Sequence, residues 1–208
     1  MAKNVQPVPV VGITGIIGSG KTLLAKLFGD CGAFIIDADK IGREVLENNS
    51  DVFTRVVEHF GGSILENDMT INRKKVAEIV FASEDHLRKL NAIIHPPMIK
   101  LIEDKVRDIV ILNKYPMVVV DAALIFEAGV EQRFDYIITV SASIENIIKR
   151  LSEQKGMPEM DVRLRMKSQI SQEEKIDKAH FIIENNSTIE EFAERGRNLF
   201  QEICDSFN

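Results

Sequence analysis

Short apolar runs alternate with longer amphipathic stretches along the chain. Five runs are predicted to be strands because they are brief, continuous and bounded by turn-forming residues; they cover residues 8–14, 33–37, 117–121, 136–140 and 181–184. Continuous rather than alternating apolar runs are typical of strands that are covered on both faces. The pattern therefore predicts an α/β protein with a five-stranded parallel sheet.

Helical periodicity follows most of these strands. Ser143 can cap the helix after the fourth strand, while Ser171 with Glu174, and Ser187 with Glu190, have the spacing of a capping box. The predicted helices cover residues 21–30, 39–48, 51–60, 144–153 and 173–178, and a final helix follows Ser187.

The spacing of the predicted strands is uneven. About eighty residues separate Asp37 from Met117, which is more than one crossover helix needs, so we predict a helical insertion over residues 61–108. Within it, His95-Pro96-Pro97 is predicted to interrupt a helix, because proline cannot continue a helix from within. A second helical excess over residues 145–178 is rich in Lys and Arg, and in a kinase it would be a lid. The nucleotide-binding core would then comprise residues 1–60, 109–144 and 179–208.

A glycine-rich loop joins the first predicted strand to the helix that follows it. Gly15, Gly20, Lys21 and Thr22 satisfy the pattern G-x-x-x-x-G-K-[ST], with Ile16, Ile17, Gly18 and Ser19 between them. Glycines let backbone N–H groups turn toward phosphate oxygens, lysine adds a cation, and the threonine hydroxyl is a ligand for Mg²⁺. The loop therefore predicts binding of ATP with Mg²⁺.

Three aspartates follow two of the predicted strands. Asp37 and Asp39 stand at the carboxyl end of the second strand, and Asp121 ends the third. Carboxylates at this edge can hold Mg²⁺ or accept a proton from an attacking hydroxyl. Structural alternatives stay open here, since Asp39 can cap a helix and Asp121 can simply end a strand.

Two further residues have a functional and a structural interpretation. Arg43 lies one helical turn beyond Asp39 and can contact a substrate, or it can be a solvated surface arginine. His95 precedes two prolines, and a single histidine of this kind is more often structural than a ligand contact.

Composition narrows the class of protein. The 208 residues are 45% hydrophobic and 28% charged, as in soluble globular proteins, and the net charge of −6 argues against a general nucleic-acid binder. The two cysteines, Cys31 and Cys204, lack metal-ligand spacing and are expected to be reduced thiols. Because no apolar run reaches the roughly 18 residues of a membrane span, we expect a cytoplasmic protein with no membrane association and no targeting signal.

These motifs, in this order, resemble the dephospho-CoA kinase family over about residues 10–191. The P-loop alone is common to many families, but the other elements are more specific. They are Asp37-Ala38-Asp39 with Arg43, His95-Pro96, Leu124-Ile125-Phe126-Glu127, Arg165 with Gln169, and residues 179–185, which end at Asn185.

The resemblance implies transfer of the γ-phosphoryl of ATP to the ribose 3′-hydroxyl of dephospho-CoA. We expect a monomer or weak homo-oligomer. It also implies a three-layer P-loop core with a helical substrate-binding insertion and a helical lid. The residue roles that it implies are as follows: Asp39, Lys21 and Arg165 are catalytic; Asn185 and residues 15–22 bind ATP; Asp37, Arg43, Arg73 and His95 are on the substrate side; and Thr22, Asp37 and Asp121 serve Mg²⁺.

The chain departs from the family pattern at five positions. Ile16 and Ser187 replace glycines, Ala123 a proline, His180 an aspartate and Gln154 a frequent lid arginine. These departures affect the expected adenine and lid contacts more than the reaction. Two rival hypotheses are another small-molecule P-loop kinase for a nucleoside or nucleotide, and a nucleotide-binding module without catalysis. Turnover of dephospho-CoA separates all three.

Overall fold

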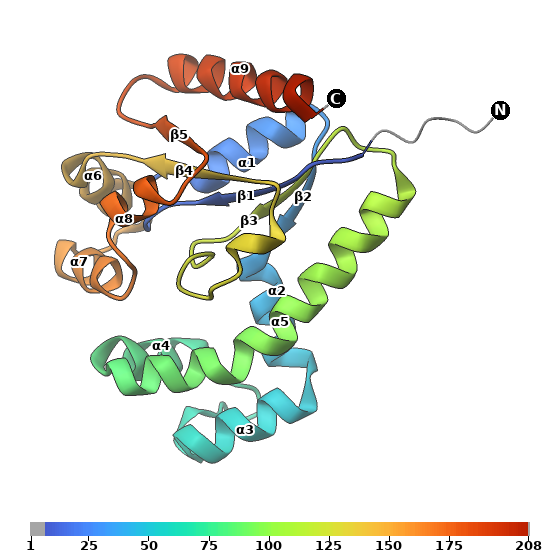
Figure 1. Ribbon diagram of the computed structural model, residues 1–208. Helices are drawn as coiled ribbons and strands as arrows, with labels where there is room; N and C mark the ends of the chain where they lie inside the picture. The colour runs from blue at the N-terminus through green and yellow to red at the C-terminus, as the bar shows by residue number, and fades with distance from the viewer. Residues whose placement is uncertain (1–6, 208) are drawn as a thin grey trace. The chain divides into compact units, whose positions relative to one another are not determined.

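The computed structural model describes residues 7–207, and within them the five predicted strands are confirmed. They pair in parallel throughout, in the order β2-β3-β1-β4-β5 (Figure 1). The strands are β1 (Val10–Thr14), β2 (Phe34–Asp37), β3 (Val118–Asp121), β4 (Tyr136–Ser141) and β5 (Phe181–Glu184). Because β1 lies between β3 and β4, the chain changes direction across the sheet at β1, and ligands of open α/β sheets bind at such a point.

The helices also follow the sequence pattern closely. They are α1 (Lys21–Asp30), α2 (Ala38–Asn48), α3 (Ser50–Phe60), α4 (Arg73–Ala82), α5 (Glu84–Leu112), α6 (Ile144–Lys155), α7 (Glu159–Lys167), α8 (Gln172–Asp177) and α9 (Ile189–Phe207), with 3-10 turns η1 (Gly62–Ile64) and η2 (Glu131–Arg133). Among the described residues, no helix is both long enough and apolar enough to span a membrane. The N-terminal residues 1–6, on which the expected lack of a targeting signal partly rests, lie outside the described residues.

The described chain divides into two compact units. One comprises the residues up to Asp37 together with those from Lys105 onward, and the other comprises Ala38–Asp104. The first contains the sheet, the glycine loop and the predicted lid, and the second is helical. The second unit includes α2 and α3, which the sequence-based boundaries assigned to the core. The binding role predicted for the insertion stays a prediction.

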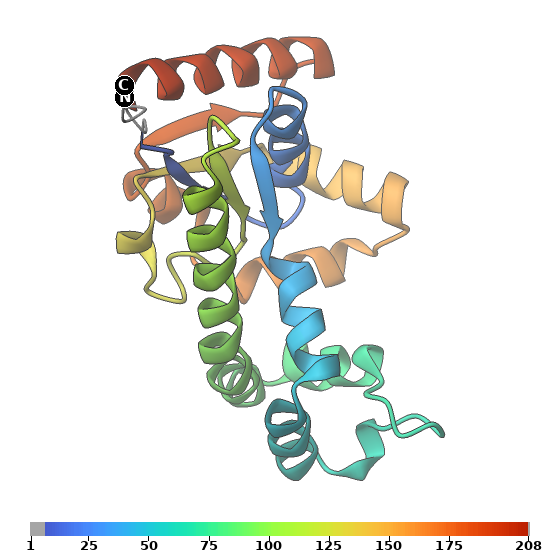
Figure 2. The ribbon, with the colours of Figure 1, turned by 90° about the vertical axis from the view of Figure 1, so that its right-hand side faces the viewer.

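One face of the sheet is covered by α1 and α9, which lie on the same side of it in both views (Figure 1 and Figure 2). Val11, Ile13, Ile138 and Val140 point to this side, and their alternation along β1 and β4 follows from the period of two in a strand. They form one core with Leu24, Ala25 and Phe28 of α1 and with Phe192, Phe200 and Ile203 of α9.

The opposite face is covered partly by the segment that follows β3. Ile125 and Phe126 of this segment form a buried cluster with Ile137 of β4. A Cβ added to Gly12 would lie 2.7 Å from Ile125 and 3.2 Å from Phe134, so glycine is needed there for this close approach. The segment is thereby held beneath the strand that leads into the glycine loop.

The predicted interruption at His95-Pro96-Pro97 is wrong. α5 is one helix of 29 residues with both prolines inside it. Each proline removes one backbone hydrogen bond, but the remaining bonds on either side maintain the helix, and its axis changes direction along its length (Figure 1). The two prolines therefore lie inside the helix and do not end it.

Candidate active site

The glycine loop of residues 15–22 connects β1 to α1, as predicted. Gly15, Gly18 and Gly20 have φ angles of 145°, 76° and 110°, which favour glycine. A Cβ at Gly15 would lie 2.3 Å from the carbonyl oxygen of Val140, and one at Gly20 would lie 2.1 Å from Nδ2 of Asn185. Both glycines are therefore required by the conformation of the loop and by the space around it.

Ile16, where the family has glycine, serves as an apolar anchor. Its φ is outside the positive region, so a β-branched residue is tolerated, and its side chain is 4% exposed. It packs with Ala142, with Ile147 and Leu151 of α6, and with Val162 of α7. The departure from the family pattern thus ties the loop to the predicted lid.

The loop ends in the N-terminus of α1. Helix α1 begins at Lys21, and its N-cap residue, Gly20, has no side chain that could accept from the N–H groups of the first turn. Such N–H groups, together with the helix dipole, attract phosphate. The Lys21 ammonium donates to the carbonyl oxygen of Ile16 over 3.3 Å, which holds the cation across the loop.

Two oxygen ligands predicted for Mg²⁺ meet at the end of β3. The Thr22 hydroxyl donates to Oδ2 of Asp121 over 2.9 Å, and Asp121 is 9% exposed. Asp37 is the sheet neighbour of Asp121 and is exposed, so a second carboxylate stands at the same edge. A hydroxyl and carboxylates are hard oxygen donors, as Mg²⁺ requires.

Asn185 supports the loop from the end of β5. Its Nδ2 donates to the carbonyl oxygen of Ser19 over 2.8 Å, while its own carbonyl oxygen and Oδ1 accept from Nη2 of Arg150 at 2.6 and 3.2 Å. The contact with ATP predicted for Asn185 stays a prediction, and its observed contacts hold the loop backbone. Arg150 belongs to the segment of residues 145–178 that is rich in Lys and Arg, and no motif in the sequence predicts these contacts.

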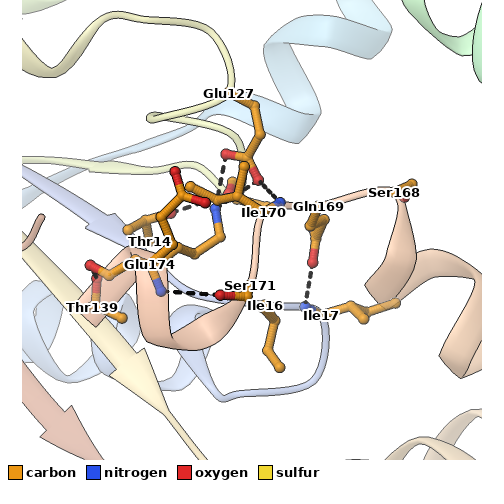
Figure 3. Close-up of polar contacts among 12 residues, drawn as sticks. Thr14, Ile16, Ile17, Glu127, Thr139, Ser168, Gln169, Ile170, Ser171 and Glu174 are labelled. Carbon is orange, nitrogen blue, oxygen red and sulfur yellow. Dashed lines mark hydrogen bonds and ion pairs between the residues drawn. The ribbon is translucent and has the colours of Figure 1, made fainter. Parts of the chain in front are cut away.

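The predicted lid comprises α6, α7 and α8, and a polar contact joins it to the loop. Oε1 of Gln169 accepts from the N–H of Ile17 over 2.9 Å (Figure 3). Arg165 is half-buried in the last turn of α7, and its carbonyl oxygen accepts from the Ser168 hydroxyl at 2.8 Å. Of the motif of Arg165 and Gln169, the glutamine thus contacts the glycine loop directly.

Glu127 has a partner that sequence reasoning missed. Its two carboxylate oxygens lie 2.7 and 2.8 Å from Nζ of Lys175, whose side chain is fully buried. Burial lowers the pKa of Lys175, and the hydrogen bond and charge of Glu127 offset part of that shift. No local pattern singles out Lys175, because a lysine on a short polar helix is ordinarily solvent-exposed.

His180, which departs from the family pattern, is a hydrogen-bond acceptor for the sheet. Nδ1 of His180 accepts from the N–H of Ile137 over 3.0 Å, and the His180 N–H donates to the carbonyl oxygen of Ile137. A backbone N–H can only donate, so Nδ1 is the acceptor in this contact. Ala123 likewise keeps a backbone function, since its carbonyl oxygen accepts from Thr14 and Lys175.

The remaining predicted residues lie in the helical unit. α2 begins at Ala38, so Asp39 is in its first turn and does not occupy the N-cap position that the structural alternative required. Arg43 Nε donates to the carbonyl oxygen of Asp39 at 3.1 Å. Arg73 begins α4 and forms an exposed ion pair with Glu47 at 3.6 Å, while His95 is half-buried inside α5. Their roles toward a substrate stay predictions.

The helical unit also contains a cavity of about 410 Å³. It lies between α2 and α5, and its polar lining includes Glu44, Asn48, Asn49, Lys100 and Asp104, with Val45, Pro97 and Leu101 as the apolar part.

Comparison with known proteins agrees with the resemblance. The family model for dephospho-CoA kinase matches residues 9–191. A dephospho-CoA kinase from Aquifex aeolicus is 35% identical over 193 residues, which are 93% of this chain and 96% of that protein. The structure of dephospho-CoA kinase from Campylobacter jejuni superposes with a TM-score of 0.70 at 26% identity and covers 95% and 98% of the two chains. A shikimate kinase from Acinetobacter baumannii, at 15% identity, has a TM-score of 0.51, covers 97% and 96%, and shares the fold.

Proposed function

The chain belongs to the dephospho-CoA kinase family, and from this premise we propose that it transfers the γ-phosphoryl of ATP to the ribose 3′-hydroxyl of dephospho-CoA. The product would be coenzyme A. The observation that carries the proposal is the family match over residues 9–191, which includes the glycine loop, the aspartates and the lid together. Kinases of this fold share the loop, so the loop alone would leave the acceptor open.

ATP would bind with its phosphates on the glycine loop. The N–H groups of the loop and of the first turn of α1 supply fixed donors, and Lys21 supplies a cation. The positive φ angles of Gly15, Gly18 and Gly20 support this proposal, because they let the backbone approach the phosphates closely.

Mg²⁺ fits the oxygen donors beside the loop. Thr22 and Asp121 would hold it, with Asp37 at the same edge of the sheet. The described residues contain no group of three or more His, Cys, Asp or Glu side chains that could hold a metal by themselves. Mg²⁺ keeps several waters and commonly uses one or two carboxylates together with substrate phosphates, so Thr22, Asp121 and Asp37 would suffice. When bound, it would neutralise charge on the phosphates.

The acceptor would be activated by Asp39. An aspartate in a kinase active site accepts the proton of the attacking hydroxyl, and Asp39 is an exposed acid two residues after the end of β2. Its place inside the first turn of α2, rather than at the cap, leaves its carboxylate unneeded for capping.

The helical unit would bind the rest of dephospho-CoA. It contains a cavity of about 410 Å³, a volume in the range of small-molecule pockets, although the residues that line it are not the predicted substrate-side residues. Arg43, Arg73 and His95 are substrate-side candidates, and the exposed ion pair of Arg73 is too weak to prevent Arg73 from meeting an anionic group. Arg165 would stabilise charge that develops during transfer.

The predicted lid, residues 145–178, would close over ATP and exclude water, since a bound γ-phosphoryl is otherwise open to hydrolysis. We place the reaction in the cytoplasm and expect a monomer or weak homo-oligomer to carry it out.

An ATP-dependent assay of dephospho-CoA against a panel of nucleosides and nucleotides tests the proposal. We expect turnover of dephospho-CoA and phosphorylation at the ribose 3′ position of the product. Lys21→Ala is the control and should lose transfer. Preferred turnover of a nucleoside, or ATP binding without any phosphorylated product, would contradict the proposal.

A further inference from the structure

The buried ion pair of Glu127 and Lys175 is an unusual feature of the sheet-containing unit. The Lys175 side chain is 0% exposed and that of Glu127 15%, and the Lys175 ammonium donates to both carboxylate oxygens and to the carbonyl oxygen of Ala123. All three ammonium hydrogens therefore have acceptors. Taking two charges out of water is costly, so such a pair contributes little net stability and is better explained by what it fixes in place.

Glu127 fixes the segment that carries Gln169. Oε1 of Glu127 accepts from the N–H of Ile170 over 3.1 Å, and the neighbouring Gln169 accepts from the N–H of Ile17 in the phosphate loop (Figure 3). The anchored backbone N–H and the side chain that contacts the loop thus belong to adjacent residues. A displacement of the Glu127 carboxylate would therefore be transmitted to the contact between Gln169 and Ile17.

Lys175 connects the ion pair to the residue that precedes the glycine loop. The carbonyl oxygen of Ala123 that accepts from Lys175 at 2.9 Å also accepts from the hydroxyl of Thr14 at 3.1 Å, and Thr14 directly precedes Gly15. The backbone of Lys175 is held as well, because its carbonyl oxygen accepts from Thr139 of β4 at 2.9 Å. The ion pair thus holds the entry to the loop and the segment that contacts it.

Arg165 is restrained by the same arrangement. The N–H of Gln169 donates to the carbonyl oxygen of Met166 at 3.1 Å and the Ser168 hydroxyl donates to that of Arg165 at 2.8 Å, so residues 165–169 form one hydrogen-bonded turn. Fixing Gln169 therefore restrains the backbone from which the Arg165 side chain extends.

We propose that Glu127 and Lys175 are positioning residues for phosphoryl transfer, which act by holding Gln169 against the N–H of Ile17. This proposal rests on the proposed kinase function. In this proposal the effect of Glu127 and Lys175 on the reaction passes through Gln169 and the glycine loop, and requires no contact of either residue with a substrate.

A double-mutant cycle between Glu127→Gln and Gln169→Met tests the coupling. We expect each single variant to lower kcat by about 10- to 100-fold, the scale of a small misplacement of catalytic groups, while the KM for dephospho-CoA stays within about twofold. The double variant should be no worse than the poorer single variant, because the two changes act on one connection: Glu127→Gln removes the charge and one of the two carboxylate acceptors that fix the segment at Ile170, and Gln169→Met removes the contact that this segment positions. Losses in kcat that multiply, or a changed KM for dephospho-CoA with kcat intact, would overturn the proposal.

A double variant that lacks both charges distinguishes a positioning role of the ion pair from a contribution to stability. Glu127→Gln combined with Lys175→Met removes both charges at similar volume, and should recover thermal stability relative to Lys175→Met alone. We expect kcat to stay low, since a methionine side chain at position 175 cannot orient the amide at position 127. Recovery of kcat together with stability would reduce the pair to a structural role and refute the proposal.

A control on the same helical segment and a measurement that does not depend on turnover complete the test. Lys178→Met removes an exposed ion pair with Glu174 of α8 and should leave kcat within about twofold.

Hydrogen exchange of the Ile17 amide should be faster in Glu127→Gln and unchanged in Lys178→Met. If the unaltered protein does not phosphorylate dephospho-CoA, the proposed function fails, and exchange at Ile17 still decides the positioning: unchanged exchange in Glu127→Gln would refute it.

Discussion

The hydroxyl of Thr22 donates a hydrogen bond to the carboxylate of Asp121 over 2.9 Å, which joins the first turn of α1 to the end of β3. The parallel pairing of β1 with β3 makes this possible, because it places Asp121 opposite Ile13, two residues before the phosphate loop. Two oxygen atoms of the types that Mg²⁺ prefers therefore converge from segments that are 99 residues apart in the chain.

Thr22→Val should weaken the use of Mg²⁺ because it removes the hydroxyl and keeps the shape of the side chain. We expect the Mg²⁺ concentration for half-maximal activity to rise by about 10- to 100-fold, the scale seen when groups that orient a metal are removed. Thr22→Ser retains the hydroxyl and should titrate like the unaltered protein. An unchanged Mg²⁺ dependence in Thr22→Val would exclude Thr22 from the metal site.

Asp39→Asn should separate catalysis from binding. The substitution preserves the size of a side chain in the first turn of α2 and removes its basicity, so the helix should remain folded. We expect kcat to fall by about 100-fold or more, the usual scale for a lost general base, with ATP affinity largely retained. Isothermal titration with a non-hydrolysable ATP analogue measures the affinity. Turnover near that of the unaltered protein would rule out the assignment of the base.

Ile16→Gly should loosen the phosphate loop from the lid. The Ile16 side chain is 4% exposed and packs against α6 and α7, so its removal loses buried apolar surface and leaves a cavity. We expect a loss of about 3–5 kcal/mol in the free energy of unfolding, with faster proteolysis within residues 145–178. Ile16→Val removes a single methylene group and should cost only about 1 kcal/mol. Equal stability of the two variants would show that Ile16 is no anchor.

His180→Asp should be tolerated better than His180→Leu. Aspartate can accept from the N–H of Ile137 as His180 does, whereas leucine leaves that N–H without its acceptor. An unsatisfied buried donor costs about 1–3 kcal/mol, so His180→Leu should lower the unfolding free energy by that amount in a chemical denaturation experiment. If both variants were equally stable, Nδ1 of His180 would contribute nothing to the free energy of unfolding.

The sheet and the glycine loop could be predicted from the sequence because their signals are local. Strands show as continuous apolar runs, and Gly15 to Thr22 follow one of them directly. The role of Glu127 could not be predicted, because Lys175, its partner, is 48 residues away and lies on a helix whose sequence is typical of an exposed one. The continuous helix through Pro96 and Pro97 could not be predicted from the local sequence, because the helix-breaking tendency of proline opposes the helical pattern on both sides. Contacts that depend on the packing of distant segments leave no local trace.

The stability contributed by Lys175 should rise with pH in the alkaline range. Burial lowers the pKa of Lys175 below its usual value of 10.5, so between the native pKa and 10.5 the unfolded chain binds more protons than the native protein. The free energy of unfolding then increases with pH over that window and is flat below it. Compared with the variant that combines Glu127→Gln and Lys175→Met, the unaltered protein should therefore gain relative stability from neutral pH toward 10.5, as measured by urea denaturation at each pH.

Lys178, which follows the same helix, should show the opposite slope. Its hydrogen bond with Glu174 raises the pKa of Lys178 above 10.5, so its stabilising effect is present below 10.5 and is lost as the pH rises through the native pKa. The unaltered protein should thus have a slightly higher free energy of unfolding than Lys178→Met below pH 10.5, and this difference should disappear as the pH rises further. Parallel slopes for the two comparisons would mean that Glu127 outweighs burial and raises the pKa of Lys175, contrary to the environment described for this buried ammonium.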